Sequence, residues 1–296
     1  MLEALAADAA RDPSLDVTVL VDAAREINLP DGMRVETVPH DAEISSLVDA
    51  ATRNDRAVLV APETNGILAD RVARVRAAGG HPVAAGLRFL AIAGDKQATI
   101  DALAAAGVPV PAGRSLSADE PFPLGFHLPA IRKARASAGC DGLQIIRPPG
   151  GVAASAGATR LEALIAGTPV GVSCLCGGDL EILPPLRQRF TDGDRPRYLG
   201  SEPLPNPSLA TRAQGLARRA VAALERAAGD EPAAGWVGVD MILGDRHDGL
   251  DDRVLEVNPR LTTSFVVQSR GASLSLVRSM IDRAATPREC TPLPRR

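Results

Sequence analysis

The stretch Leu255-Glu256-Val257-Asn258-Pro259-Arg260 carries more information about fold and chemistry than any other part of this chain. It closes a predicted strand at 253–258, in which Glu256 and Asn258 are two residues apart. Side chains at alternate strand positions point to the same face of a sheet. The stretch therefore predicts a carboxylate and an amide oxygen side by side, with Arg260 directly after the strand.

A second predicted strand at 236–243 precedes this stretch and carries Asp240. If the connecting loop is centred near Asp248, an antiparallel hairpin places Asp240 opposite Glu256 to within one residue. Two neighbouring carboxylates repel each other, and Mg²⁺, which prefers oxygen ligands and shares them with substrate phosphates, removes that repulsion. Asp240, Glu256 and Asn258 are therefore predicted metal ligands. The alternative is a solvated acidic face of the hairpin.

The chain has 33 basic residues, of which only Lys96 and Lys133 are lysines. A lysine is a compact, flexible point charge, whereas an arginine presents a flat fork. Lysines that persist in an arginine-rich chain are candidates for contacts with phosphates. Lys96 begins a predicted helix at 96–106, and Lys133 immediately precedes a loop of small residues at 134–142. The alternative is a drift in codon usage that left two stray lysines.

The small-residue loop at 134–142 contains Gly139 and Gly142. A loop with little side-chain bulk can fold over phosphates and present backbone N–H groups to them. Small-residue turns are common, and the adjacent Lys133 is what makes this one a candidate. Arg260 could hold a phosphate through two parallel hydrogen bonds, or be an ordinary surface arginine.

Two further groups of residues are candidates for contacts with anions or substrates. Thr262, Thr263 and Ser264 could cap the helix that follows them or bind an anion at its N-terminus. Glu63 follows a predicted strand at 57–61, at the end where open α/β sheets bind their ligands. It could hold the ammonium group of an amino acid. The alternative is an exposed acid ahead of a helix.

The first part of the chain alternates between predicted strands and helices. Strands are predicted at 17–21, 34–38, 57–61 and 81–85, and helices at 44–53 and 65–78, the second capped by Asn65 and stopped by Gly79 and Gly80. The alternation predicts a small open parallel sheet, in which the continuous apolar run at 57–61 is buried on both faces. No glycine motif of the dinucleotide-binding or P-loop type is present, which excludes those two standard sites.

A second unit is expected from about residue 92 onward. Helices are predicted at 96–106 and 209–228, and strands at 128–131, 143–146, 162–165, 236–243 and 253–258. The proline and polar residues at 183–207 predict mostly loop. The tail after residue 285 is expected to fray.

Composition narrows the functional classes. With 2% aromatic residues and a net charge of −3, the chain lacks the stacking platform and basic field of a nucleic-acid-binding protein. It has no apolar run that could span a membrane and no secretory signal, so we expect a cytoplasmic protein with no membrane partner. Cys140, Cys174, Cys176 and Cys290 show no metal-type pairing and are expected to be buried thiols.

Taken in order, these features resemble the ATP-grasp ligases, and the resemblance covers nearly the whole chain. The shared order is an α/β domain, a first lysine, a second lysine before a small-residue loop, an acidic hinge and then Asp…Glu-x-Asn-x-Arg. Within this superfamily the chain is most similar to the tyramine–glutamate ligase group of methanofuran-type coenzyme biosynthesis. The stretches that carry this closer similarity are Ala61-Pro62-Glu63-Thr64, Ile92-Ala93-Gly94-Asp95-Lys96, Tyr198-Leu199-Gly200, Gly235-Trp236-Val237-Gly238-Val239-Asp240 and Glu256-Val257-Asn258-Pro259-Arg260-Leu261-Thr262-Thr263-Ser264.

The resemblance implies an α/β ATP-grasp fold with an N-terminal Rossmann-like open sheet, a small lid subdomain and a C-terminal α+β lobe. The expected divisions are a pre-ATP-grasp α/β domain at 1–91 and an ATP-grasp domain at 92–296, with the lid at about 92–166 and the lobe at about 167–296. Two departures from the family pattern stand out. The loop at 135–142 has fewer glycines, and the family usually has a strand and a Gly-rich turn ahead of the segment that resembles 2–8.

The resemblance also implies roles for the candidate residues. The ATP-binding residues would be Lys96, Lys133, Gly139 and Gly142 at the phosphates, with Glu162 and the backbone near Leu164 at the adenine. Mg²⁺, with Mn²⁺ as an alternative, would be held by Asp240, Glu256 and Asn258. Arg260 would be the catalytic residue that steadies the transferred phosphate, and Glu63 and Thr262 would contact the substrate.

The implied reaction is amide formation by an ATP-dependent carboxylate–amine ligase through an acyl phosphate, with glutamate and tyramine as the favoured pair. The alternatives are an ATP-grasp ligase of another acid and amine, or a non-catalytic nucleotide-binding protein. The expected partners are a small-molecule carboxylate and a small-molecule amine. The oligomeric state is left open, with a homodimer as one option.

Overall fold

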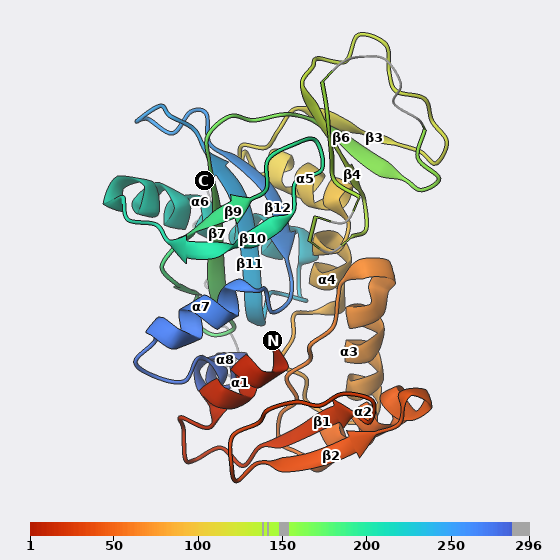
Figure 1. Ribbon diagram of the computed structural model, residues 1–296, viewed down its shortest axis with the longest axis vertical. Helices are drawn as coiled ribbons and strands as arrows, with labels where there is room; N and C mark the ends of the chain where they lie inside the picture. Colours follow the sequence, from red (N-terminus) through yellow and green to blue (C-terminus); the bar gives the residue numbers. More distant parts are fainter. Residues whose placement is uncertain (138, 141, 148–153, 286–296) are drawn as a thin grey trace.

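The computed structural model describes residues 1–137, 139–140, 142–147 and 154–285 (Figure 1). In chain order its elements are α1 Leu2–Ala9, β1 Thr18–Asp22, β2 Arg34–Val38, α2 Glu43–Arg53, α3 Ile67–Ala77, α4 Leu87–Ala93, α5 Lys96–Ala105, β3 Gly113–Leu116, β4 Ala130–Ala134, β5 Gln144–Ile146, β6 Thr159–Ala163, β7 Thr168–Cys176, β8 Glu181–Ile182, β9 Leu186–Phe190, β10 Tyr198–Pro203, α6 Pro207–Ala228, β11 Gly235–Leu243, β12 Arg253–Asn258, α7 Ser264–Gly271 and α8 Leu276–Ala285. The predicted α/β class is therefore confirmed.

A six-stranded antiparallel sheet forms the centre of the molecule. Its strand order is β10-β9-β7-β11-β12, with the short β8 paired to β7. β11 pairs with β7 over its full length, from Gly235 opposite Cys176 to Leu243 opposite Thr168. Helices α4, α5 and α6 pack on one face of this sheet, and α1, α7 and α8 lie on the other side.

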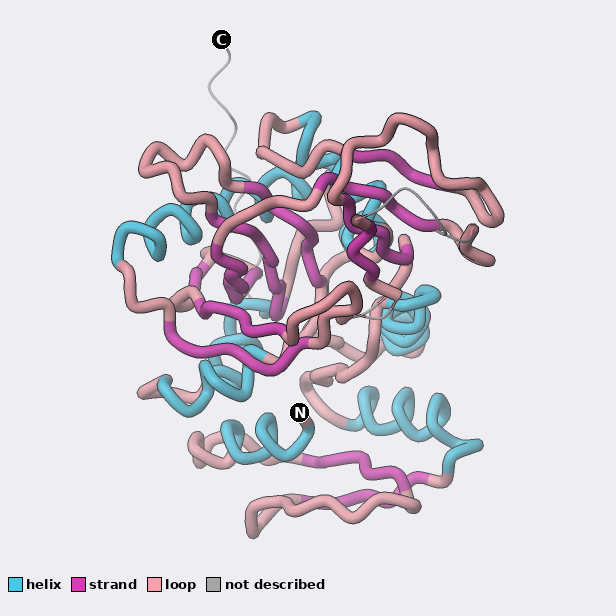
Figure 2. Tube along the Cα trace, turned by 45° about the horizontal axis from the view of Figure 1, so that its top comes forward, coloured by secondary structure: helices cyan, strands magenta, loops and turns pink. Residues whose placement is uncertain are grey.

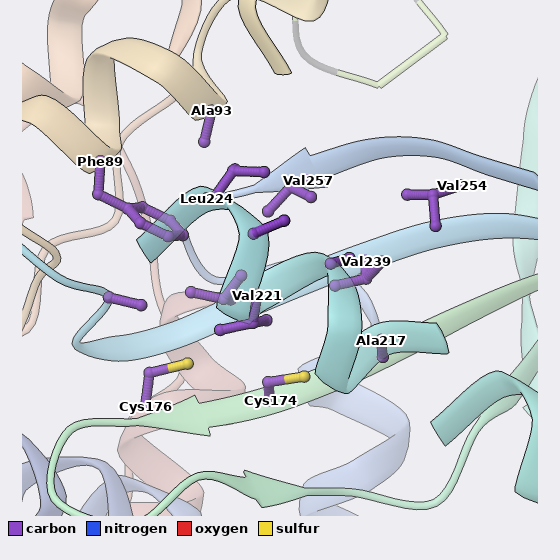
Figure 3. Close-up of a cluster of buried hydrophobic side chains, with 14 of the residues drawn as sticks. Phe89, Ala93, Cys174, Cys176, Ala217, Val221, Leu224, Val239, Val254 and Val257 are labelled. Atoms are coloured by element: carbon purple, nitrogen blue, oxygen red, sulfur yellow. The ribbon is translucent and has the colours of Figure 1, made fainter. Parts of the chain in front are cut away.

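Alternate residues of β11 and β7 supply both cores of this sheet. Val239 of β11 and Cys174 of β7 lie in the core beneath α6 (Figure 3), and Val237 belongs to the same core. Trp236 and Leu175, one position along, belong to the opposite core with α7 and α8. This period of two is what a strand buried on both faces requires. Burial raises the pKa of the Cys174 thiol to about 12, so it packs as a neutral apolar group.

A second, four-stranded antiparallel sheet has the order β3-β6-β4-β5. It lies at one end of the molecule, beside α5 (Figure 1). Its small core consists of Leu116, Ala130, Ile146 and Leu161. In its register Lys133 of β4 lies opposite Arg160 of β6, and Glu162 lies opposite Ile131.

The N-terminal sheet is smaller than predicted. β1 and β2 form a two-stranded parallel pair at the other end of the molecule (Figure 2). The predicted strands at 57–61 and 81–85 were wrong, because these segments share only one parallel bridge, Ala57 to Pro82. Within the described residues, no strand lies next to 57–61 on its other side, so most of its backbone lacks a ladder partner.

Asn65 does not cap a helix as predicted. Its φ of 54° places it in the left-handed region, within a single 3₁₀ turn, and α3 begins after Gly66 without a side-chain cap. The predicted end of this helix is confirmed, since Gly79 follows it with a φ of 85°.

The segment at 183–207 was predicted to be mostly loop, and this prediction was wrong. It contains β9 and β10, which pair with each other at the edge of the large sheet. Exposed edge strands tolerate prolines and charged residues. Because these residues are also typical of loops, the sequence composition does not reveal such strands. β7 and β3 were also missed. The tail after residue 285 and the thiol of Cys290 lie outside the described residues.

No helix in the described part of the chain is both long enough and apolar enough to cross a membrane.

Candidate active site

The β11–β12 hairpin brings the three predicted metal ligands together. Asp240 lies directly opposite Glu256, and Gly238 lies opposite Asn258, so the predicted register is confirmed. The Asn258 amide donates from Nδ2 to Asp240 Oδ2 at 2.9 Å and to Glu256 Oε1 at 3.4 Å. The three side chains therefore converge on one face of the sheet.

Gln188 of β9 also belongs to this group, and sequence reasoning missed it. Its Nε2 donates to Asp240 Oδ1 at 2.7 Å. A Cβ on Gly171 of β7 would lie 3.0 Å from Gln188 Nε2 and 3.2 Å from Asp240 Oδ1, so the small residue leaves room for this contact. The alternation Leu186-Arg187-Gln188-Arg189-Phe190 is the signal that could have revealed the strand and its inward amide.

Lys96 lies beside this carboxylate pair. Its Nζ is 3.4 Å from Glu256 Oε2 and donates to the Ser137 carbonyl at 2.7 Å. The lysine is placed by the start of α5, where Asp95 accepts hydrogen bonds from the backbone of Gln97 and Ala98. The backbone N–H of Lys96 also donates to the Arg135 carbonyl at 3.0 Å, which ties α5 to the end of β4.

Lys133 reaches the same hairpin from the small sheet. Its Nζ lies 2.8 Å from Glu162 Oε2 and donates to the Leu255 carbonyl at 3.2 Å. The register of the hairpin skips Leu255, since Asp240 pairs with Glu256 and Met241 pairs with Val254. A bulged residue is left out of the ladder, and here its carbonyl serves as the acceptor for Lys133.

Both lysines are buried, with 7% of Lys96 and 6% of Lys133 exposed. A buried ammonium group needs nearby negative charge or carbonyl oxygens. Neither lysine is therefore a surface residue, and each lies at the β11–β12 hairpin.

The two carboxylates of the hairpin have different electrostatic surroundings. Burial together with the negative charge of Glu256 raises the pKa of Asp240 to about 7. Burial also acts to raise the pKa of Glu256, but the ammonium charges of Lys96 and Lys133 outweigh it and the pKa is lowered. The site therefore has a surplus of carboxylate near Asp240 that a cation would relieve.

Glu162 is almost fully buried and its carboxylate is engaged on both oxygens. Oε2 faces Lys133, and Oε1 lies 2.6 Å from the Nε of Arg160, another residue that sequence reasoning did not identify. The backbone N–H of Leu164 donates to the Pro129 carbonyl at 3.1 Å. Glu162 thus orients Lys133 and Arg160. The backbone N–H of Leu164 is therefore already used within the protein.

Arg260 and Glu63 are bound to each other. The guanidinium donates from Nη2 to Glu63 Oε1 at 3.1 Å and from Nε to Glu63 Oε2. Glu63 is only 8% exposed, so the interpretation as a solvent-exposed acid was wrong, and Arg260 is partly buried. The pair joins the loop after 57–61 to the end of β12, two segments that are far apart in the sequence.

Thr262 lies beside this region but does not cap α7. Its Oγ1 accepts from Trp236 Nε1 at 3.1 Å and shares a hydrogen bond with Ser264 Oγ. The residue before α7 is Thr263, which makes no side-chain cap, so the capping prediction for these hydroxyls was wrong. The Thr262 hydroxyl is held by the core tryptophan instead, and the Ser264 hydroxyl also shares a hydrogen bond with Ser173 Oγ at 2.9 Å.

The small-residue loop is described only in part. Gly139 and Gly142 have φ values of 66° and 72°, which glycine adopts without strain. Ala138 and Asp141 lie outside the described residues. Cys140 is partly exposed, in contrast to the buried Cys174 and Cys176.

The donor set of the hairpin fits Mg²⁺ that also binds substrate phosphates. Across the described residues no cluster of three or more His, Cys, Asp or Glu could hold a metal by itself. Two carboxylates and one amide are nevertheless the ligand number that Mg²⁺ takes when phosphates and water complete its shell. In this structure the Nδ2 of Asn258 faces the carboxylates of Asp240 and Glu256. Binding a cation through Oδ1 therefore requires the Asn258 amide to flip.

Comparison with known families and structures identifies the fold. A family model described as an ATP-grasp domain matches residues 93–264, and a pre ATP-grasp domain model matches 15–84. The chain belongs to the ATP-grasp family, whose enzymes use ATP with Mg²⁺ or Mn²⁺. Its mixed α/β architecture is the ATP-grasp fold that the sequence predicted.

Solved structures share this fold at low sequence identity. The ADP complex of N5-carboxyaminoimidazole ribonucleotide synthetase matches with a TM-score of 0.74 and 18% identity, over 97% of this chain and 75% of that one. D-alanine–D-alanine ligase from Bacillus anthracis matches with a TM-score of 0.66 and 17% identity, over 92% and 97%. L-amino acid ligase from Bacillus licheniformis matches with a TM-score of 0.69 and 18% identity, over 95% and 71%. A comparison with curated proteins found no match.

Proposed function

We propose that this protein is an ATP-dependent carboxylate–amine ligase that forms an amide through an acyl phosphate. The observation that carries the proposal is the convergence of Lys96, Lys133, Asp240 and Glu256 on one face of the β11–β12 hairpin. Closely spaced, buried positive and negative groups suit a nucleoside triphosphate with its metal ion better than they suit an amino acid or a sugar.

The proposed roles of the residues are supported by where these residues lie. Lys96 and Lys133 neutralise phosphate oxygens of ATP, and the backbone of Gly139 and Gly142 approaches the same phosphates. Bound Mg²⁺, held by Asp240, Glu256 and Asn258, supplies positive charge at the phosphates. Such transfer needs little covalent chemistry from the protein, and positioning with charge neutralisation carries the rate.

Arg260 and Glu63 mark the substrate end of the site. Arg260 lies two residues after Asn258, so it can steady the phosphoryl group as it passes to the carboxylate substrate. Glu63 orients Arg260 in the free protein, and its second role is to accept the ammonium group of an amino-acid substrate. Thr262, two residues after Arg260, adds a hydroxyl to the same part of the site.

We further propose glutamate and tyramine as the acid and the amine, in a cytoplasmic enzyme of methanofuran-type coenzyme biosynthesis. The support is the similarity of the stretches Ala61-Pro62-Glu63-Thr64 and 256–264 to that ligase group. We also propose the division into 1–91 and 92–296, with a lid at about 92–166, since the small sheet β3-β6-β4-β5 falls within the lid.

The test is formation of ADP by purified protein with ATP and Mg²⁺, across a panel of carboxylates and amines. A ligase releases ADP only when an acid and an amine are both present, and mass spectrometry detects the amide. ATP binding without turnover on any pair would assign the chain to the non-catalytic alternative. Turnover on a pair other than glutamate and tyramine would retain the ligase and reject the substrate assignment.

A further inference from the structure

Arg160 of β6 is almost completely buried, with only 2% of the residue exposed. It lies directly opposite Lys133 of β4 in the small sheet, so the two side chains are on the same face. Like charges at directly opposite positions of an antiparallel sheet destabilise it. Two buried cations in this arrangement therefore need an anion that they share.

Glu162 is the shared anion. It lies two residues after Arg160 on β6, and alternate residues of a strand share a face. Its Oε1 accepts from the Nε of Arg160 at 2.6 Å, and its Oε2 lies 2.8 Å from the Nζ of Lys133. One carboxylate therefore serves two cations, and the three side chains together keep a surplus of positive charge.

The other contacts of Arg160 are with neutral groups. Its Nη1 donates to Gln97 Oε1 at 2.5 Å, and its Nη2 donates to the Pro111 carbonyl at 3.4 Å. A Cβ on Gly113 would lie 3.1 Å from Arg160 Nη2, so the small residue leaves room for the guanidinium. Neutral oxygens solvate the guanidinium without cancelling its charge. Burying surplus charge is costly, and an anionic ligand offsets that cost.

We propose that Arg160 is a positioning residue of the ATP site, which takes up the charge of Glu162 and so leaves the charge of Lys133 available to the phosphates. The inference rests on the proposed function, because it assigns Lys133 to ATP. Without Arg160, Glu162 would pair with Lys133 alone, and a neutral pair attracts phosphate less strongly. Through Gln97, the residue after Lys96, the same guanidinium also ties α5 to the small sheet.

The test compares the wild type with Arg160→Gln, with Glu162→Gln and with the double variant, by calorimetry with ATP and Mg²⁺. Arg160→Gln should weaken ATP binding about tenfold or more, because the group loses one positive charge. The double variant should bind ATP within about threefold of wild type, because it restores the original net charge. A purely structural role predicts the opposite order, since the double variant loses more buried hydrogen bonds than either single variant.

Two controls separate charge from packing. Arg160→Lys keeps the charge and should bind ATP within about threefold of wild type. Arg114→Gln removes an exposed cation from β3 of the same sheet and should leave ATP binding unchanged. The same titrations with inorganic triphosphate remove any effect at the adenine, and Tm with circular dichroism checks the fold of each variant. If Arg160→Gln fails to fold, Glu162→Gln decides, because it should bind triphosphate at least as tightly as wild type.

A second readout does not use ATP. The chain has only two lysines, so isotope-labelled lysine gives two side-chain signals by NMR, which Lys96→Arg assigns. Exchange of the Lys133 ammonium protons with water should be slowed about threefold or more in Arg160→Gln, because Glu162 then binds this ammonium alone. The double variant should not show this slowing.

Unchanged or faster exchange at Lys133 in Arg160→Gln would overturn the proposal. So would a double variant that binds ATP no better than Arg160→Gln, or weakened triphosphate binding in Glu162→Gln. A wild-type protein that binds neither ATP nor triphosphate would reject the proposed function instead, whereas the exchange rates, measured without ATP, test the role of Arg160 separately.

Discussion

At the scale of single residues, the site is a balance of two ammonium groups and two carboxylates. Lys96 and Lys133 approach the β11–β12 hairpin from different elements, and each also uses a backbone carbonyl, of Ser137 and of Leu255. The carbonyls hold the lysines in place while leaving charge for a ligand. Glu256, between the lysines and Asp240, is the residue on which this balance depends.

We expect Glu256→Gln to lower turnover at least about a hundredfold, because it removes one strong electrostatic contact to the metal ion while keeping the shape of the side chain. Steady-state ADP formation measures the effect, and circular dichroism checks that the fold is intact. Asp245→Asn, a change at an exposed acid in the loop of the same hairpin, is the control and should leave turnover unchanged. Near-normal turnover in Glu256→Gln would rule out the metal assignment.

We expect Lys133→Arg to weaken ATP binding about tenfold or more, since a wide guanidinium replaces a point charge in a buried space between Glu162 and Leu255. Calorimetry gives the dissociation constant, and Tm reports any loss of stability. Arg132→Lys is the matched control, because Arg132 is the neighbouring position of the same strand and contacts Gln144 instead. Equal ATP affinity in Lys133→Arg and wild type would exclude Lys133 from the phosphate site.

At the scale of elements, the hairpin that carries Asp240, Glu256 and Asn258 is fastened to α6. Asp252, at the end of its loop, is 5% exposed and accepts from the N–H of Gly244 at 3.0 Å. Arg212 of α6 donates to Asp252 Oδ2 at 3.0 Å and to the Gly244 carbonyl at 2.9 Å. Arg212 therefore bridges the two ends of the hairpin loop and holds the two strands in register.

Asp252→Asn should lower the free energy of unfolding by about 2–3 kcal/mol, because it leaves Arg212 without its carboxylate in a mostly buried position. Denaturant unfolding followed by circular dichroism measures this change. Asp251→Asn, at the adjacent exposed acid, should stay within about 0.5 kcal/mol of wild type. If the two variants unfold alike, the clamp contributes nothing and the hairpin is held by its packing alone.

At the scale of the whole molecule, the site is assembled from three regions. The small sheet supplies Lys133 and Glu162, the large sheet supplies the hairpin, and the N-terminal unit supplies Glu63. The bond between Glu63 and Arg260 is the polar contact through which the N-terminal unit reaches the site. A substrate bound there would touch a different region from ATP.

Glu63→Gln should raise the apparent KM for the amino-acid substrate and leave ATP affinity unchanged, since the neutral amide attracts an ammonium group less strongly and Glu63 belongs to the N-terminal unit, whereas the proposed ATP-binding lysines do not. Initial-rate kinetics with each substrate varied in turn separate the two effects. Glu43→Gln, at an exposed acid of the same unit that pairs with Arg71, is the control. Unaltered kinetics for every substrate would place the substrate pocket elsewhere and leave Glu63 only as the partner of Arg260.

The sequence by itself determined the hairpin and its facing residues. β12 spans the predicted residues, and Asp240 faces Glu256, because a hairpin joins neighbouring segments and its register follows from strand period and loop length. The sequence also singled out Lys96 and Lys133, because they are the only two lysines of the chain, and the structure places both beside this hairpin. The ATP-grasp fold was expected because the order of these features resembles that family, and the family match confirms it.

Only the tertiary structure decided what pairs across long sequence distances. Gln188 meets Asp240 because β9 joins the large sheet, and Glu63 meets Arg260 because the N-terminal unit packs against the end of β12. No local periodicity encodes either contact. The segment 57–61 gives the converse case, because its apolar run predicts a strand, yet a strand requires a neighbour to supply its hydrogen bonds. A sequence pattern indicates that a segment is able to form a strand, whereas tertiary packing determines whether a neighbouring strand lies beside it.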